Sequence, residues 1–237
     1  MEEAIKKIIE MLEKGKITAE DAERLIKAVK EAGKKEREYR FFDFGWISEM
    51  VKDAIHSAFI SKKGGFEEVI TEIPLKEIIK VTSYSGDIKI KTQKRDNIKI
   101  EAEGANFKEE ENEIIVNSYG DTEIFMPEEN NLIIIYNYSG EIELEGNFKK
   151  LKINTYSGDI SIDGEFDEID LDTYNGDCKV KTKRKPIMIN FNTYSGEIEL
   201  PEGFKKEGNV YIYGEGEYKR IGVRNYSGDF ELKFKEE

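Results

Sequence analysis

The sequence predicts a mainly β protein built as a β-solenoid, a chain that winds in coils so that equivalent strands stack on one another. Three observations predict it. A Tyr-Ser-Gly-Asp/Glu turn recurs from Tyr84 almost to the C-terminus. From Tyr138 to Tyr194 the tyrosines of successive copies are 18, 18 and 20 residues apart, and a fixed period of this size is typical of stacked repeats. Apolar and polar residues also alternate on both sides of each turn, as they do in strands with one dry and one wet face.

The copies of the turn share a glycine followed by an acidic residue. They are Tyr84-Ser-Gly-Asp87, Tyr138-Ser-Gly-Glu141, Tyr156-Ser-Gly-Asp159, Tyr174-Asn-Gly-Asp177, Tyr194-Ser-Gly-Glu197 and Tyr226-Ser-Gly-Asp229, with a shortened Ser118-Tyr-Gly-Asp121 and a worn Tyr213-Gly-Glu-Gly216. Glycine allows positive φ in a tight turn, and a neighbouring Ser, Asn or Asp can bond the local backbone. The motif is therefore a structural repeat rather than an active site.

Four apolar columns flank these turns and predict the core. Counted from each Tyr, they are Ile79, Ile114, Ile133, Leu151, Ile169, Ile189 and Ile221 at five before; Val81, Val116, Ile135, Ile153, Leu171, Phe191 and Val223 at three before; Ile88, Ile142, Ile160, Cys178, Ile198 and Phe230 at four beyond; and Ile90, Leu144, Ile162, Val180, Leu200 and Leu232 at six beyond. The alternation also fits an antiparallel β-sandwich in which each turn closes a hairpin. We prefer the solenoid because roughly fifteen strands exceed the ~10 strands that an open sheet usually holds.

The N-terminal part of the chain predicts helices. Residues 1–33 carry apolar residues at helical spacing, with Gly15 placed to cap one short helix and Thr18 placed to start a second. This helical hairpin is too small to bury much surface alone, so we expect it to dock on another surface. Residues 34–63 follow as a charged linker and an amphipathic helix, and residues 64–237 form the β-repeat domain. Between Ile98 and Asn106 of this domain we expect a degenerate coil, Ile98-Lys-Ile-Glu-Ala102, which lacks the Tyr-Ser-Gly turn.

The amphipathic helix, residues 41–60, has two interpretations. Its large apolar side chains include Phe41, Phe42, Phe44, Trp46, Met50 and Phe59. One interpretation is a helix that caps the open end of the first β coil, as repeat proteins require for solubility. The other is a helix that binds a membrane interface or a partner, with the charged run 34–40 approaching anionic lipid.

Composition limits the function classes. The net charge of −13 and the pI near 4.9 argue against a nucleic-acid-binding protein, which would need a basic face. Cys178 is the only cysteine, so no internal disulfide can form, and its place in an apolar column predicts a buried side chain. Heavy use of Lys, Glu and Ile, with Gln93 the only glutamine, is a compositional sign of a thermophilic source.

The sequence also bears on location. No signal peptide precedes the charged start of the chain, and no apolar run reaches the ~18 residues that span a bilayer. We therefore expect a cytoplasmic protein, with peripheral membrane contact as an option.

Two rows of side chains are candidate binding residues. Alternation places Tyr138, Tyr156, Tyr174 and Tyr194 on the outer surface, where they form a candidate strip for a glycan or a cationic amphipathic peptide. The acids of the turns, Asp87, Asp159, Asp177 and Asp229 among them, would form a column of carboxylates. This column is stabilised either by turn amides or, as a less favoured option, by a ladder of calcium ions. We predict no catalytic residues and no cofactor, since no nucleophile–base pair, phosphate loop or Cys/His cluster is present.

The Tyr-Ser-Gly-Asp/Glu-Ile repeats resemble the bacterial "putative adhesin" family of β-strand-repeat proteins. Residues 12–25, Leu-Glu-Lys-Gly-Lys-Ile-Thr-Ala-Glu-Asp-Ala-Glu-Arg-Leu, look like the short helical hairpin often fused in front of it. The same order of parts is found in Lia-type cell-envelope-stress proteins. The resemblance implies a non-enzymatic scaffold linked to envelope stress sensing or regulation, acting through protein, peptide or membrane contacts. The alternative is a surface adhesin or a self-assembling structural protein.

Overall fold

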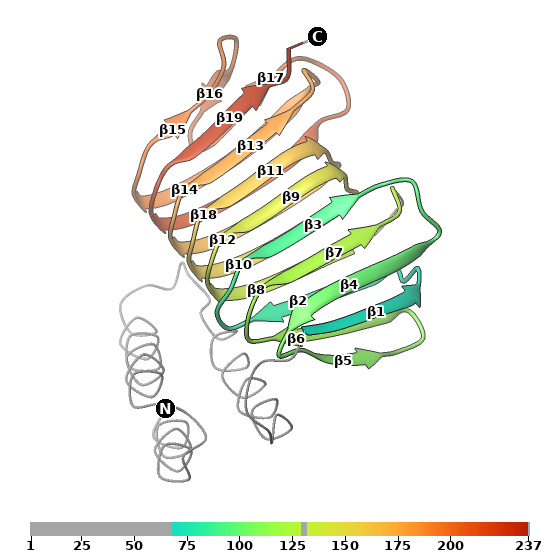
Figure 1. The fold of residues 1–237 in the computed structure, drawn as a ribbon. Coiled ribbons are helices and arrows are strands. Elements are labelled where there is room, and N and C mark those ends of the chain that lie inside the picture. Colours follow the sequence, from blue (N-terminus) through green and yellow to red (C-terminus); the bar gives the residue numbers. More distant parts are fainter. Residues whose placement is uncertain (1–67, 129–131, 237) are drawn as a thin grey trace, which may run out of the picture. The chain divides into compact units, whose positions relative to one another are not determined.

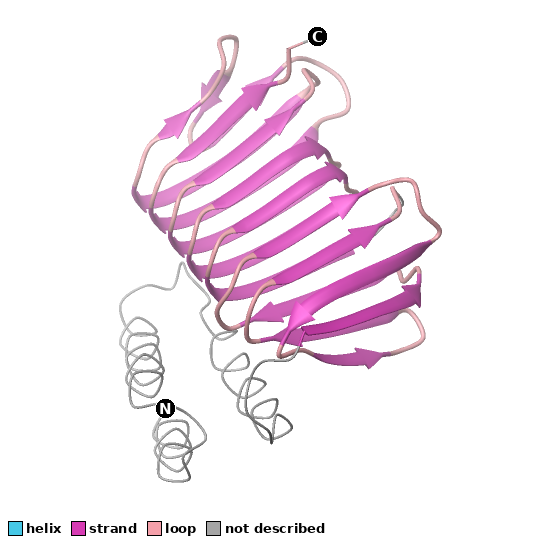
Figure 2. Ribbon diagram, in the orientation of Figure 1, coloured by secondary structure: helices cyan, strands magenta, loops and turns pink. Residues whose placement is uncertain are grey.

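The structure, a computed structural model, describes residues 68–128 and 132–236. This part of the chain folds into two large sheets joined by turns and loops, so the predicted mainly β class is confirmed (Figures 1 and 2). The predicted helical hairpin 1–33 and the segment 34–63, with the candidate residues Phe41, Phe42, Phe44, Trp46, Met50 and Phe59, lie outside the described residues.

Sheet A has nine strands, which lie side by side in an order different from that of the sequence. In spatial order they are β1 (Glu68–Pro74), β4 (Asn97–Glu103), β7 (Thr122–Met126), β3 (Ile88–Thr92), β9 (Ile142–Asn147), β11 (Ile160–Glu165), β13 (Cys178–Thr182), β19 (Phe230–Phe234) and β15 (Ile198–Glu199). From β7 to β15 all neighbours are parallel, while β1 and β4 add antiparallel strands at one edge.

Sheet B has ten strands and lies opposite sheet A. In spatial order they are β16 (Lys205–Glu207), β17 (Val210–Tyr213), β14 (Ile187–Ser195), β18 (Lys219–Ser227), β12 (Glu168–Asn175), β10 (Lys150–Ser157), β8 (Leu132–Ser139), β2 (Ile78–Ser83), β6 (Glu113–Ser118) and β5 (Asn106–Glu109). The strands from β14 to β6 are parallel, and the others are antiparallel.

Each coil consists of one strand of sheet B, a turn, and one strand of sheet A. In spatial order the coils are β6–β7, β2–β3, β8–β9, β10–β11, β12–β13, β18–β19 and β14–β15 (Figure 1). Equivalent residues lie beside one another, as Ile153 does between Ile135 and Leu171. This parallel stacking is the arrangement of a solenoid, and it excludes the antiparallel sandwich for these coils.

The last coil in the sequence is not the last coil in the stack. Strands β18 and β19 lie between β12–β13 and β14–β15, so the coil that contains Tyr194 is two positions away from the coil that contains Tyr174. The lengths of the connecting loops reflect this skipped position. Two residues, 148–149 or 166–167, join neighbouring coils, whereas four residues, 183–186, lead from β13 to β14. These two extra residues account for the tyrosine spacing of 20 in place of 18.

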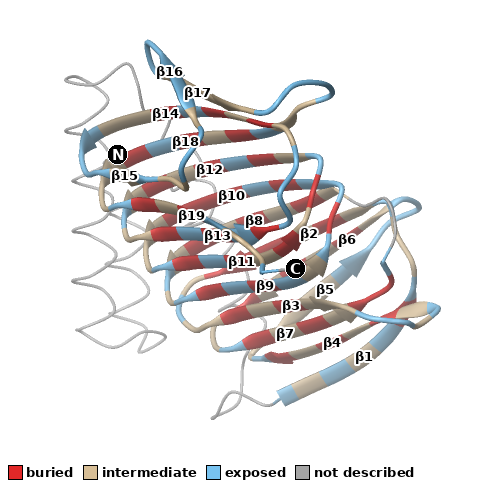
Figure 3. Ribbon diagram, turned by 90° about the horizontal axis from the view of Figure 1, so that it is seen from above, coloured by how far each residue is buried: buried red, intermediate tan, exposed pale blue. Residues whose placement is uncertain are grey.

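The four apolar columns face one another between the sheets, as predicted. Nearly all their members are buried, including Cys178, and buried and more exposed positions alternate along the strands (Figure 3). Only Ile198 and Leu200 are partly buried, because they belong to the outermost coil.

Two predictions about individual segments were wrong. Tyr213 is not part of a worn turn: it ends β17, in an antiparallel hairpin with β16, and its ring lies 4.9 Å from that of Phe234 and 5.2 Å from that of Phe204. This aromatic cluster covers core residues at the end of the stack. The segment Ile98–Ala102, which we expected to form a degenerate coil, is part of β4 and pairs antiparallel with β1 and β7.

Candidate functional site

The tyrosines of the turns form a continuous row along one corner of the stack. From end to end this tyrosine row consists of Tyr119, Tyr84, Tyr138, Tyr156, Tyr174, Tyr226 and Tyr194. From Tyr84 onward the ring centroids are 5.3, 5.0, 5.0, 4.7 and 4.9 Å apart, with interplanar angles of at most 17°. Tyr119 is tilted by 53° at 6.2 Å.

This geometry determines what the row can offer to a partner. Tyr138, Tyr156 and Tyr174 are adjacent, as the sequence predicts, but Tyr226 lies between Tyr174 and Tyr194. Because each inner ring is stacked on both sides, ring faces are not available for a sugar. Tyr194, at the end of the row, is 61% exposed. The row therefore suits a partner that runs along it better than one that stacks on it.

A column of carboxylates runs beside the tyrosine row. This acid column consists of Asp121, Asp87, Glu141, Asp159, Asp177, Asp229 and Glu197, in the order of the stack. The backbone N–H of one acid donates to an Asp Oδ1 on the neighbouring coil, as in Asp87 to Asp121 (2.9 Å), Glu141 to Asp87 (2.9 Å), Asp177 to Asp159 (2.9 Å), Asp229 to Asp177 (2.9 Å) and Glu197 to Asp229 (2.8 Å). One oxygen of each of these aspartates is thus held by an amide, which offsets part of the repulsion between like charges.

The members of the acid column form no ion pairs within the described residues. None of the ion pairs in this part of the chain includes a member of the column. Lysines on the outer face of sheet A instead pair across strands, as Lys89 does with Glu143 at 3.2 Å and Lys91 with Glu145 at 3.4 Å. These lysines therefore pair with carboxylates of the sheet face and not with the acid column.

The proposed calcium ladder finds no support in this arrangement. Asp159, Asp177 and Asp229 lie on successive coils, and Asp87 lies between Asp121 and Glu141, but their Oδ1 atoms accept hydrogen bonds from backbone amides. Over residues 68–128 and 132–236, no group of three or more His, Cys, Asp or Glu side chains is placed to hold a metal ion.

A third column, which we did not predict, lies inside the same corner. It is polar and consists of Ser118, Ser83, Asn137, Thr155, Thr173, Asn225 and Thr193, each directly before a Tyr. Nδ2 of Asn137 donates to the carbonyl of Gly140 (2.8 Å), and Nδ2 of Asn225 donates to that of Gly228 (2.6 Å). These two asparagines thus satisfy carbonyls of their own turns, whereas the hydroxyls of Ser83, Thr155, Thr173 and Thr193 have no hydrogen-bond partner within the described residues. The sequence pattern could have predicted this polar column, because alternation places the residue before each Tyr on the inner face.

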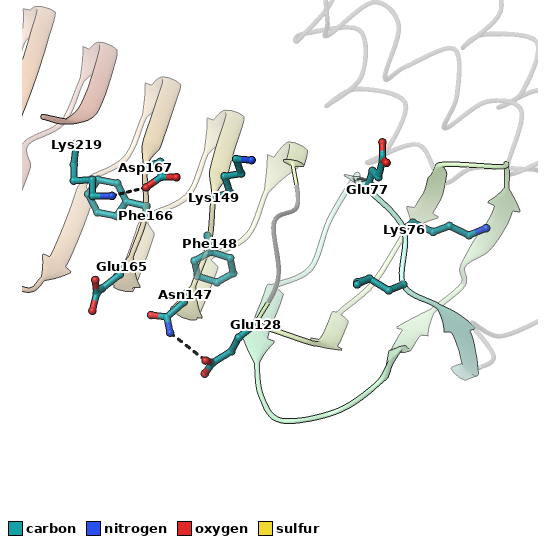
Figure 4. A pocket seen from close by; sticks show the side chains of 11 residues that line it. Lys76, Glu77, Glu128, Asn147, Phe148, Lys149, Glu165, Phe166, Asp167 and Lys219 are labelled. Atoms are coloured by element: carbon teal, nitrogen blue, oxygen red, sulfur yellow. Dashed lines mark hydrogen bonds and ion pairs between the residues drawn. The ribbon is translucent and has the colours of Figure 1, made fainter. Parts of the chain in front are cut away.

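A hollow of about 590 Å³ lies where coils pass from sheet A back to sheet B (Figure 4). Its wall includes Phe148 and Phe166, which are buried, and its rim carries both acidic and basic side chains. The rim is largely paired internally: Asn147 donates to Glu128 at 3.3 Å, and Lys219 pairs with Asp167 (Figure 4). We therefore do not assign a ligand to this hollow.

Two titratable groups near the core are poorly suited to catalysis. Hydrogen bonds from Lys183 and Lys185 lower the pKa of Glu165, at the rim of the hollow, to about 2, so this carboxylate stays ionised at neutral pH. Burial raises the pKa of the Cys178 thiol to about 12, and the thiolate is the nucleophilic form of cysteine. Neither group can serve as a general acid or a nucleophile near pH 7.

Comparisons with solved structures place the fold among known ones. A protein from Clostridium sporogenes ATCC 15579, described as a "putative cell adhesion protein", is similar with a TM-score of 0.60 and 17% identity over 72% of this chain and 100% of that one. A "putative adhesin" from Bacteroides fragilis NCTC 9343 is similar with a TM-score of 0.32 and 10% identity, over 71% of this chain and 97% of that one. The first likeness shows a shared fold, and the second score is too low to support an argument.

The remaining comparisons concern families. No curated protein matches the chain, and within the described residues no helix is long and apolar enough to cross a membrane. A SHOCT-like domain matches residues 3–34. The Toastrack DUF4097 family matches residues 32–233, which include all of the coils except the last residue of β19. The chain therefore belongs to the Toastrack DUF4097 family.

Proposed function

We propose that this protein is a non-enzymatic, adhesin-like scaffold whose acid column binds a cationic segment of a protein or peptide. The observation that carries the proposal is the series of turn carboxylates, one per coil, that takes part in no ion pair within the described residues. Such a line of like charges concentrates cations at the surface and favours partners rich in Lys or Arg.

Several features support a binding role over a catalytic one. The stack is a rigid frame that repeats the same corner at the spacing of β-strands, about 4.8 Å, and repeat proteins commonly use such extended surfaces for recognition. The Clostridium protein of similar fold is described as a "putative cell adhesion protein", which agrees with an adhesin-like role. Nothing in the comparisons supports the envelope-stress role that the resemblance implies, and membrane contact through Phe41, Trp46 and their neighbours remains a separate proposal.

The proposal predicts that neutralising the corner abolishes binding without unfolding the protein. The variant combines Glu141→Gln, Asp159→Asn and Asp177→Asn, because Asn keeps an Oδ1 acceptor for the neighbouring amide while losing the charge. The affinity for a short peptide of alternating lysine and serine should fall by ~10-fold or more, equivalent to about 1.4 kcal/mol. Isothermal titration calorimetry at low and at physiological salt concentration measures this affinity. The unchanged protein should bind the peptide more weakly at the higher salt concentration.

A matched control removes three charges from the outer face of sheet A. It combines Glu143→Gln, Glu145→Gln and Asp163→Asn, whose carboxylates pair with lysines of that face. This variant should bind the peptide within about twofold of the unchanged protein, since surface ion pairs are largely neutralised locally. Equal weakening in both variants would mean that only net charge matters and would refute a specific site at the corner.

A further inference from the structure

The coil formed by β18 and β19 is an inserted element. It occupies the interior of the stack although it comes last in the sequence, with β12 and β13 on one side and β14 and β15 on the other. Within the described residues, those two coils pair with each other only through it. Residues 68–128 and 132–213 therefore surround a slot, one strand wide in each sheet, which residues 219–234 fill.

The fit of this coil to its slot is extensive. Ile221, Val223, Phe230 and Leu232 are at most 1% exposed, and the ring of Tyr226 stacks between those of Tyr174 and Tyr194. Arg224 pairs with Asp172 and Lys219 with Asp167, both on the side of β12. The same contacts would form if another molecule of this protein supplied the coil, because they involve only the side chains of the coil and those of the two coils beside it.

The connection to the inserted coil has the character of a hinge. Residues 214–218 join β17 to β18, and Gly214 and Gly216 adopt positive φ of 74° and 125°. Both glycines are exposed. The opposite connection, residues 183–186, already spans the slot and holds β14 two positions from β12. The two walls of the slot, β12–β13 and β14–β15, are thus both formed by residues that precede the inserted coil in the sequence.

We propose that a second copy of this chain can fill the slot with its own residues 219–234, so that the protein assembles by exchange of the C-terminal coil. Exchange preserves every contact of the coil and alters only the hinge, which is the condition for domain swapping. Reciprocal exchange gives a closed dimer, and successive exchange gives an open chain of molecules. This inference goes beyond the proposed function and does not depend on it.

Cysteine pairs distinguish the two ways of filling the slot. Lys179 of β13 and Glu231 of β19 are register partners on the outer face of sheet A, so Lys179→Cys with Glu231→Cys forms a disulfide in either case. The variant is refolded at low and at high protein concentration, oxidised, and run on a non-reducing gel. We expect a bond within one chain after dilute refolding, and bonds between chains as the main product after concentrated refolding.

A matched pair within the fixed part of the stack is the control. Ser161 and Lys179 are register partners on β11 and β13, so Ser161→Cys with Lys179→Cys should link within one chain at both concentrations. Removing Glu215 and Gly216 from the hinge should increase the bonds between chains in the first pair, because a shorter hinge strains the closed form. Bonds within one chain at both concentrations, with and without the shortened hinge, would overturn the proposal, as would equal bonding between chains in the control pair.

Discussion

Replacing Gly158 by alanine should destabilise the protein by about 3 to 5 kcal/mol, through backbone strain and overlap together. Gly158 adopts a φ of +137°, and a Cβ built on it would lie 2.0 Å from the carbonyl oxygen of Gly140 on the neighbouring coil. Gly176 and Gly140 meet their neighbours in the same way, so relaxing one coil displaces the next. Urea unfolding followed by circular dichroism measures the loss.

Gly216 provides the matched control for this substitution. Its φ of +125° is similar, but a Cβ there would meet only Pro186 Cγ, at 3.9 Å. Gly216→Ala should therefore show the backbone strain alone, about 1 to 2 kcal/mol. If both substitutions cost the same, close contact between stacked turns would not be the reason for glycine at this position.

Phe230→Ala should cost about 3 to 5 kcal/mol, the range for truncating a fully buried aromatic side chain. Phe230 lies on the inserted coil, is 0% exposed, and its ring centroid is 6.2 Å from that of Phe191. Since it links β13 to the outermost coil, the cavity would weaken the closure of the stack at this end. Thermal unfolding measures this loss of stability, because the melting temperature of a domain of this size falls by roughly 2–4 °C for each kcal/mol.

Phe125 is the corresponding control on the outer surface. It lies on β7, partly exposed, with Nζ of Lys99 5.8 Å from its ring centroid. Phe125→Ala should cost less than about 1 kcal/mol, the scale of an exposed cation–π contact. A large loss at Phe125 with a small one at Phe230 would place the core on the wrong side of the sheets.

The sequence was sufficient to predict the repeating unit because alternation acts locally. Ile133, Ile135, Ile142 and Leu144 can face one core only if the chain turns between them, and the turn carries the glycine this requires. The outer position of the tyrosines and acids follows from the same alternation. The buried residues before each Tyr follow from it too, but a Ser, Thr or Asn in that place did not suggest an inner column.

The order of the coils could not be predicted, because repeats with the same columns make neighbouring slots equivalent. A strand carrying Val223 and Tyr226 fits beside Leu171 and Tyr174 as well as the strand carrying Phe191 does. What selects the order is loop length, and the only trace of it in the sequence is the pair of extra residues within 183–186. The antiparallel hairpin β16–β17 was likewise missed, since its Tyr-Gly-Glu-Gly resembles the turn motif.

The most direct test of the stacked corner uses single disulfides between turn positions. Ser227 is the register partner of both Asn175 and Ser195, so cysteine pairs 175/227 and 195/227 should oxidise readily. The pair 175/195 should not, because two strand spacings separate its Cα atoms by about 9.6 Å, beyond the ~7 Å that a disulfide can bridge. Rapid bonding of 175/195, with none at 175/227, would contradict the stacking order and the tyrosine row built on it.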